Sequence, residues 1–155
     1  MPKNAVLIQS KLLDQVVQEA ACSKRQRMNF NFHQLNDPAN RMLNAIEPES
    51  YIQPHRHLKP PRDEAFLVLR GCGAIFLFKD DGVVEQVHLL DSNHENFGVD
   101  IPAGWYHTIV SLKPGSIFYE VKAGPYDPSL AKEFAKWAPS KNYPQAPIYL
   151  EKLKK

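Results

Sequence analysis

Four residues have the types and spacing of a metal site: His55, His57, Glu64 and His107. His55 and His57 are two residues apart, so on a strand their side chains would point to the same face. Neutral imidazoles are common metal ligands. A carboxylate from Glu64 and a third imidazole from His107 would complete the donor set. We therefore expect these four side chains to bind one metal ion.

The donor set leaves the identity of the ion open. Two imidazoles and a carboxylate with free positions suit catalytic Fe(II), and sites rich in histidine also hold other first-row metals. We expect one divalent ion, which would be Fe, Zn, Mn or Ni. It would act as a Lewis acid or, if it is iron, bind O₂.

Strand alternation extends the site to residues two or four positions from a predicted ligand, which would share that ligand's face. These candidate substrate-binding residues are Tyr51, Gln53, Phe66 and Trp105. They would form a largely aromatic cavity, a common form of small-molecule site. Arg56 should point away from it. Arg41, Lys59 and Arg62 could attract an anionic substrate to the mouth, although exposed cations are ordinary on any protein surface.

The elements that would position these residues are short strands. After residue 28, runs rich in β-branched and aromatic residues alternate with turn signals such as Asp80-Asp81-Gly82. Many short strands at regular spacing indicate a sandwich or a barrel. The expected strands cover residues 41–46, 50–55, 64–70, 74–78, 83–90, 97–101, 105–112 and 116–122.

One helix is expected before the strands. Residues 8–24 have apolar side chains at helical spacing, and Ser10 is a candidate N-cap. In the tail, a short amphipathic piece around Phe134 and Trp137 should dock on the barrel, and the charged end should fray. The chain would thus divide into an N-terminal helical segment (1–27), a β-barrel (28–123) and a C-terminal tail (124–155).

Composition narrows the class of protein. A length of 155 residues fits one domain, and a net charge of +2 gives no case for nucleic acid as the partner. No segment predicts a membrane span or a signal peptide, and Cys22 and Cys72 are expected to be reduced. We expect a cytoplasmic protein with a small-molecule ligand. Residues 65–69 are apolar on both strand faces, which favours cover by a second sheet or a homodimer.

The sequence resembles the cupin superfamily at two motifs. HRH at 55–57, followed by Glu64 and Gly71, is similar to the first cupin motif, and PAGWYH at 102–107 is similar to the second. The resemblance implies an all-β cupin jelly-roll barrel in which the three histidines and the glutamate bind the metal. The gap between His57 and Glu64 is longer than in the motif, so Asp63 stays open as an alternative ligand.

A narrower resemblance, to the WbuC family of cupin-fold metalloproteins, covers most of the chain. It rests on NFNFH at 29–33, PHRH at 54–57, the Pro60-Pro61 pair and GPYDP at 124–128. Members of that family are often associated with bacterial surface-polysaccharide (O-antigen) gene clusters. The resemblance therefore implies a role in polysaccharide biosynthesis.

The sequence leaves two main classes of function open. The first is a metal-dependent enzyme that acts on a small sugar-like or acidic substrate, with catalytic residues that no motif identifies. The second is a non-catalytic module that binds or senses a sugar through its metal. A metal-free epimerase-like cupin, with His55 or His107 as a base, is disfavoured by the complete ligand set.

Overall fold

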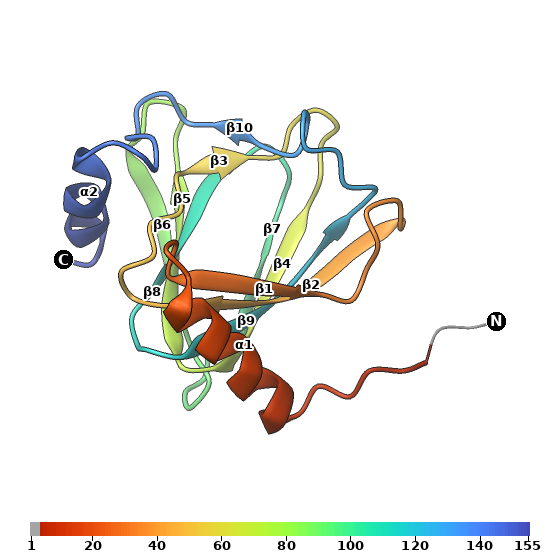
Figure 1. Ribbon diagram of the computed structural model, residues 1–155. Helices are drawn as coiled ribbons and strands as arrows, with labels where there is room; N and C mark the ends of the chain where they lie inside the picture. The colour runs from red at the N-terminus through yellow and green to blue at the C-terminus, as the bar shows by residue number, and fades with distance from the viewer. Residues whose placement is uncertain (1–3) are drawn as a thin grey trace.

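Figure 1 shows a computed structural model of the protein, which describes residues 4–155. The chain begins with helix α1 (Ser10–Cys22) and ends with helix α2 (Gln145–Leu153). Between the helices lie the strands β1 (Arg27–Asn31), β2 (Ala39–Ile46), β3 (His55–Arg56), β4 (Glu64–Arg70), β5 (Cys72–Phe78), β6 (Val84–Asp91), β7 (Gly98–Ile101), β8 (Tyr106–Ser111), β9 (Ser116–Ala123) and β10 (Glu133–Phe134).

The strands form two antiparallel five-stranded sheets that enclose the interior (Figure 1). The order in sheet A is β1-β2-β9-β4-β7, and the order in sheet B is β10-β3-β8-β5-β6. Helix α1 contacts β1, β2 and β9 of sheet A. The predicted all-β barrel with an N-terminal helix is therefore confirmed. None of the helices in the described part of the chain is long and apolar enough to cross a membrane.

Three clusters of buried apolar side chains hold the layers together. The one between the sheets comprises Ile46, Phe66, Val68, Ile75, Leu77, Leu90, Ile101, Ile109 and Phe118. A second lies under α1, and a third packs α2 and the C-terminal segment against sheet B. Because the third cluster covers its outer face, β5 is buried along its whole length. On β4, by contrast, Leu67 and Leu69 are 49% and 37% exposed.

Two predictions about local structure are wrong. Ser10 is the first helical residue rather than the N-cap, which is Gln9 and makes no side-chain capping bond. The strand expected over 50–55 is reduced to the two residues of β3. Pro54 has no N–H to donate to a ladder, so the sheet pairing begins only at His55.

The C-terminal tail is more ordered than its sequence suggests. Helix α2 includes Pro147 in its first turn, where proline is tolerated because the N–H there has no partner within the helix. The helix continues to Leu153, so the prediction of a frayed charged end is wrong. Trp137 does pack on the barrel, against Phe78 and Tyr106. Phe134, however, is 51% exposed.

Candidate metal centre

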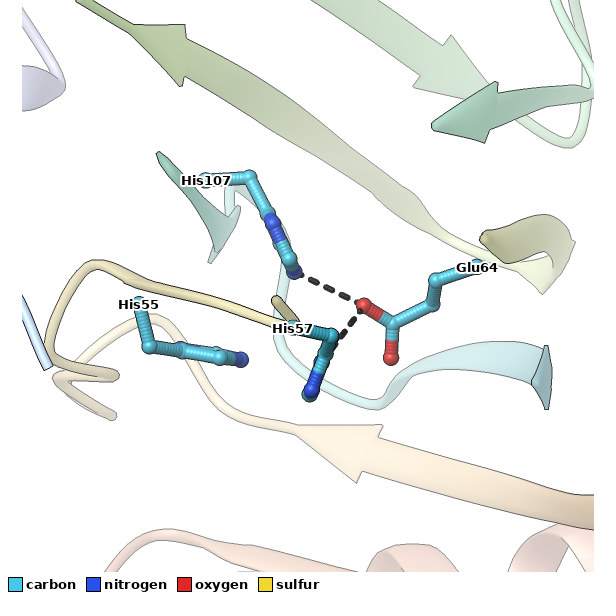
Figure 2. Close-up of side chains that lie close together, drawn as sticks. All are labelled: His55, His57, Glu64 and His107. Carbon is cyan, nitrogen blue, oxygen red and sulfur yellow. Dashed lines mark ion pairs between the residues drawn. The ribbon is translucent and has the colours of Figure 1, made fainter. Parts of the chain in front are cut away.

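The four predicted ligands meet inside the barrel (Figure 2). His55 lies opposite His107 where β3 pairs with β8 in sheet B, and His57 follows β3 directly. Glu64 begins β4 in the facing sheet A. Their ligand atoms all lie within 4.8 Å of one another. All four side chains are buried, and the most accessible residue, His55, is only 5% exposed.

Each imidazole is held from behind by the main chain. The Nδ1 atoms of His55, His57 and His107 lie within hydrogen-bond distance of the carbonyl oxygens of Gln53, Ala131 and Trp105, respectively. A carbonyl oxygen can only accept, so each Nδ1 must carry the proton and donate it. In a neutral imidazole the Nε2 atom is then an unprotonated acceptor, which is the form that binds a metal.

These acceptors converge on a carboxylate oxygen. Oε2 of Glu64 lies 2.7 Å from Nε2 of His107 and 3.3 Å from Nε2 of His57 (Figure 2). All three atoms are buried, and none has a hydrogen-bond partner among residues 4–155. Buried acceptors that face one another without a donor are costly. A divalent cation between them would satisfy them all, so the residues present fit a metal ion.

Burial keeps the His55 imidazole neutral. Desolvation is the largest cause, and the neighbouring Lys132 and His107 add to it, so the pKa of His55 lies well below its ordinary value. Metal binding requires an unprotonated imidazole. His55 is therefore ready to act as a ligand at neutral pH without first losing a proton.

A short ladder of charges supports Glu64 from sheet A. Nζ of Lys122 lies 3.1 Å from Oε1 of Glu64 and 2.5 Å from Oε1 of Glu120, both of which accept its hydrogen bonds. Nδ2 of Asn44 donates to the other oxygen of Glu120. Burial alone would raise the pKa of Glu64, but the charge of Lys122 is the largest cause that lowers it, and the pKa lies well below its ordinary value. Burial, followed by the charge of Glu64, raises the pKa of Glu120 to about 7.

A cavity of about 380 Å³ opens beside the ligands. His55, Glu64 and His107 form part of its wall. Inward-facing residues of β1 and β2 form another part: Arg27, Asn29, Asn31, Met42, Asn44 and Ile46. The cavity is therefore both deep enough to reach the metal ligands and more polar than the aromatic pocket that the sequence predicts.

Only one of the four candidate substrate-binding residues lines this cavity, and it is Phe66. The hydroxyl of Tyr51 donates to the carbonyl of Pro139, and Nε2 of Gln53 donates to that of Ala135. Residues 51–54 do not form a strand, so the alternation that placed Tyr51 and Gln53 beside the histidines does not hold. Trp105 packs against the cluster between the sheets.

The neighbours of the ligands have other partners. Asp63 is exposed and accepts the N–H of Ala103 at 2.8 Å, so Glu64 and not Asp63 belongs to the cluster. Arg56 points away from the site, as predicted, and pairs with Glu133 at 2.6 Å and with Asp80 at 3.1 Å.

The cations of the cavity wall are not the predicted ones. Arg41, Lys59 and Arg62 do not line it. Their place is taken by Arg25, Arg27, Lys122 and Lys132. Spacing from the ligands along the sequence could not locate these four, because β1, β9 and the C-terminal segment reach the site only through sheet pairing and packing.

The C-terminal segment is the part of the site that the sequence analysis missed. The carbonyl of Ala131 holds His57, the side chain of Lys132 lines the cavity, and the ring of Phe134 lies 6.1 Å from that of His55. A contact made by a backbone carbonyl has no sequence signal. Glu120 and Lys122 did have one, because two opposite charges on one face interrupt an otherwise apolar strand.

The sequence matches one known protein family, and the function of that family is unknown. A family described as "Domain of unknown function (DUF6016)" matches residues 8–90, which is more than half of the chain. The protein belongs to the DUF6016 family. The matched part includes His55, His57 and Glu64 but ends before His107. No curated protein matches the sequence.

Solved structures with the same architecture are cupin-fold proteins. The capsular polysaccharide assembling protein CapF from Staphylococcus aureus is 22% identical, with a TM-score of 0.57 over 68% of this chain and 29% of CapF. Oxalate decarboxylase from Bacillus subtilis is 14% identical, with a TM-score of 0.53 over 70% of this chain and 27% of that enzyme. KdgF from Halomonas sp. is 16% identical, with a TM-score of 0.51 over 66% of this chain and 82% of KdgF.

These likenesses establish the fold. The DUF6016 protein is a cupin jelly roll, as its two motifs indicate. The chain spans less than a third of the length of CapF and of the oxalate decarboxylase. At these sequence identities, the likeness shows only that the strands are arranged in the same way. The activity has to be inferred from the site itself.

Proposed function

We propose that this DUF6016 protein is a metal-dependent enzyme that acts on a small sugar-like or acidic molecule. One divalent ion would be held by His55, His57, Glu64 and His107. The observation that carries the proposal is the convergence of unprotonated Nε2 atoms on the oxygen of a buried carboxylate. A bound ion would supply Lewis-acid chemistry to a coordinated oxygen.

The chain's own residues provide the setting for that chemistry. Three backbone carbonyls fix the imidazole rings, and Lys122 fixes Glu64. The cavity is lined directly by His55, Glu64 and His107, so a molecule bound there would touch the metal ligands. A volume of about 380 Å³ admits a small molecule and excludes a long polymer.

Several finer predictions belong to this proposal. Mn(II) is supported among the four candidate ions because the oxalate decarboxylase from B. subtilis contains Mn(II) centres. A link with surface polysaccharides is supported by the likeness to CapF and by the WbuC resemblance. A homodimer is supported by the exposed Leu67 and Leu69 on β4. The cytoplasmic location stays a prediction.

Turnover separates the enzyme from a non-catalytic sugar-binding module. We would load the protein with Mn²⁺, Fe²⁺, Zn²⁺ or Ni²⁺ and incubate it with a panel of sugar acids and nucleotide sugars, following products by mass spectrometry. We expect turnover of at least one compound that disappears on chelation and in the His57→Gln variant. Turnover that survives both would contradict metal dependence, and metal-dependent binding without turnover would establish the binding module instead.

A further inference from the structure

The wall of the metal cavity carries an excess of positive charge. Its cationic residues are Arg25, Arg27, Lys122 and Lys132, and its carboxylates are Glu64 and Glu120. Lys122 bonds to both carboxylates, so it is already neutralised. The excess therefore belongs to the other three cations, and a divalent ion would increase it.

Among these three cations, Lys132 is the one most closely associated with the metal ligands. It follows Ala131, whose carbonyl holds His57. The charge of Lys132 adds to burial in lowering the pKa of His55, and burial, followed by the charge of Lys122, lowers the pKa of Lys132 itself. In residues 4–155, no hydrogen bond or salt bridge joins its ammonium group to a carboxylate. An unpaired cation that faces a cavity favours the binding of an anion there.

Arg27 adds a second cation that has no carboxylate partner in the part of the chain that the structure describes. Its Nη1 donates to the hydroxyl of Ser50 at 3.1 Å and to the carbonyl of Tyr51 at 3.0 Å, both neutral acceptors. Burial, followed by the charge of Arg25, lowers the pKa of Arg27 to about 10, so it stays positive at neutral pH. A guanidinium has five N–H donors, which leaves donors on Nε and Nη2 for a ligand.

Amide groups on β1 and β2 complete this part of the wall. Nδ2 of Asn29 donates to Oδ1 of Asn31 at 2.7 Å, and Asn44 contacts Glu120. All three asparagines line the cavity. Amide groups both donate and accept, which suits hydroxyl groups, since these also do both. The wall thus combines cations that suit an acid group with amides that suit hydroxyls.

We propose that the cavity binds a small polyhydroxylated carboxylate, with Lys132 and Arg27 pairing with its acid group. The asparagine amides meet its hydroxyls, and Lys132 determines specificity for the charged over the neutral compound. This inference rests on the proposed metal centre, because the ligand must lie beside the ion. It assigns to the C-terminal segment a role in recognition in addition to holding His57.

The test uses Mn²⁺-loaded protein and two six-carbon probes that differ in charge, D-gluconate and the neutral D-glucitol. Binding is read from water-proton relaxation, which falls when a ligand displaces water from the protein-bound Mn²⁺. We expect D-gluconate to bind at least about ten-fold more tightly than D-glucitol, since charge-assisted hydrogen bonds are the stronger ones. Lys132→Gln should weaken D-gluconate binding about ten-fold, and Lys132→Arg should largely restore it. The control Lys141→Gln removes an exposed lysine outside the cavity and should change nothing.

The possible failures are distinguishable. If the unmodified protein binds no Mn²⁺, the proposed metal centre is wrong. If it binds Mn²⁺ but D-gluconate and D-glucitol bind alike, or Lys132→Gln binds D-gluconate as the unmodified protein does, the inference about Lys132 is wrong and the metal centre stands. If inorganic phosphate binds and D-gluconate does not, the carboxylate class is overturned.

Discussion

The two walls of the metal site hold their ligands by different means. On the side of sheet B, His55, His57 and His107 are each fixed by a backbone carbonyl and are neutral acceptors toward the ion. On the side of sheet A, Glu64 is charged and is fixed by the side chain of Lys122. On the imidazole wall (His55, His57 and His107), the main chain thus fixes the orientation of neutral ligands. On the carboxylate wall (Glu64), a charged side chain holds a charged ligand. Changes on the first wall should remove the metal and leave the barrel folded at neutral pH, and changes on the second should also lower its stability there.

The largest effect is expected on the imidazole wall. The double substitution His55→Ala and His57→Ala removes two of the four ligands, and metal content should fall from about one ion per chain to nearly none. The barrel should stay folded, because its apolar clusters do not include these residues. Elemental analysis after metal loading, with circular dichroism for the fold, measures both.

Its control is His94→Ala, which removes an exposed histidine outside the cluster. That variant should retain the metal. A double variant that unfolds would contradict the prediction that the barrel folds without these two histidines. A double variant that keeps a full complement of metal would contradict their role as ligands.

On the carboxylate wall we expect a cost in stability. Lys122→Met leaves Glu64 and Glu120 buried near one another without their shared cation. Removing one partner of a buried ion pair typically costs about 3–5 kcal/mol. The free energy of unfolding of the metal-free protein in urea should therefore fall by about 3 kcal/mol. The exposed Lys141→Met provides the control, and a loss of under about 1 kcal/mol in Lys122→Met would show that the ladder is not needed for folding.

The pH dependence of folding stability provides a further test of the imidazole wall. The pKa of His55 is lowered in the folded protein, so between that value and the ordinary value of about 6.5 only the unfolded chain takes up this proton. Stability from this residue is thus complete above pH 6.5 and is lost as the pH falls below it. In His55→Gln the loss of stability of metal-free protein between pH 7.5 and pH 5 should be smaller by about 1–2 kcal/mol.

Urea titrations at several pH values test this, with His94→Gln as the matched variant. Contributions from Glu64 and Glu120 are present in all three proteins and cancel in the comparison. Parallel pH profiles for His55→Gln and the unmodified protein would show that burial does not depress the pKa of this imidazole.

The smallest effect is expected at the pair between Arg56 and Glu133, which lies on sheet B and points away from the metal site. The side chain of Glu133 is 43% exposed, and exposed ion pairs typically contribute about 0–1 kcal/mol. Glu133→Gln should therefore change the free energy of unfolding by under about 1 kcal/mol and leave the metal content unchanged. A loss of metal in this variant would mean that the pair, and not the main chain, keeps Ala131 against His57.

The sequence predicts the imidazole wall better than its surroundings. The spacing of His55 and His57 places both side chains in one space, and the strand predicted over 64–70 matches β4. Both follow from local periodicity. Lys132 and Ala131 lie more than seventy residues from His57 along the chain, and β10 is only two residues long. Their place in the site depends on tertiary packing, for which no local pattern exists.

Anomalous scattering from a crystal of the metal-loaded protein tests the metal centre most directly. We predict one strong peak per chain, bounded by Nε2 of His55, His57 and His107 and by the carboxylate of Glu64. A crystal of fully loaded protein with no peak at that position, or with its only peak elsewhere, would contradict the assignment of these four residues as a metal centre.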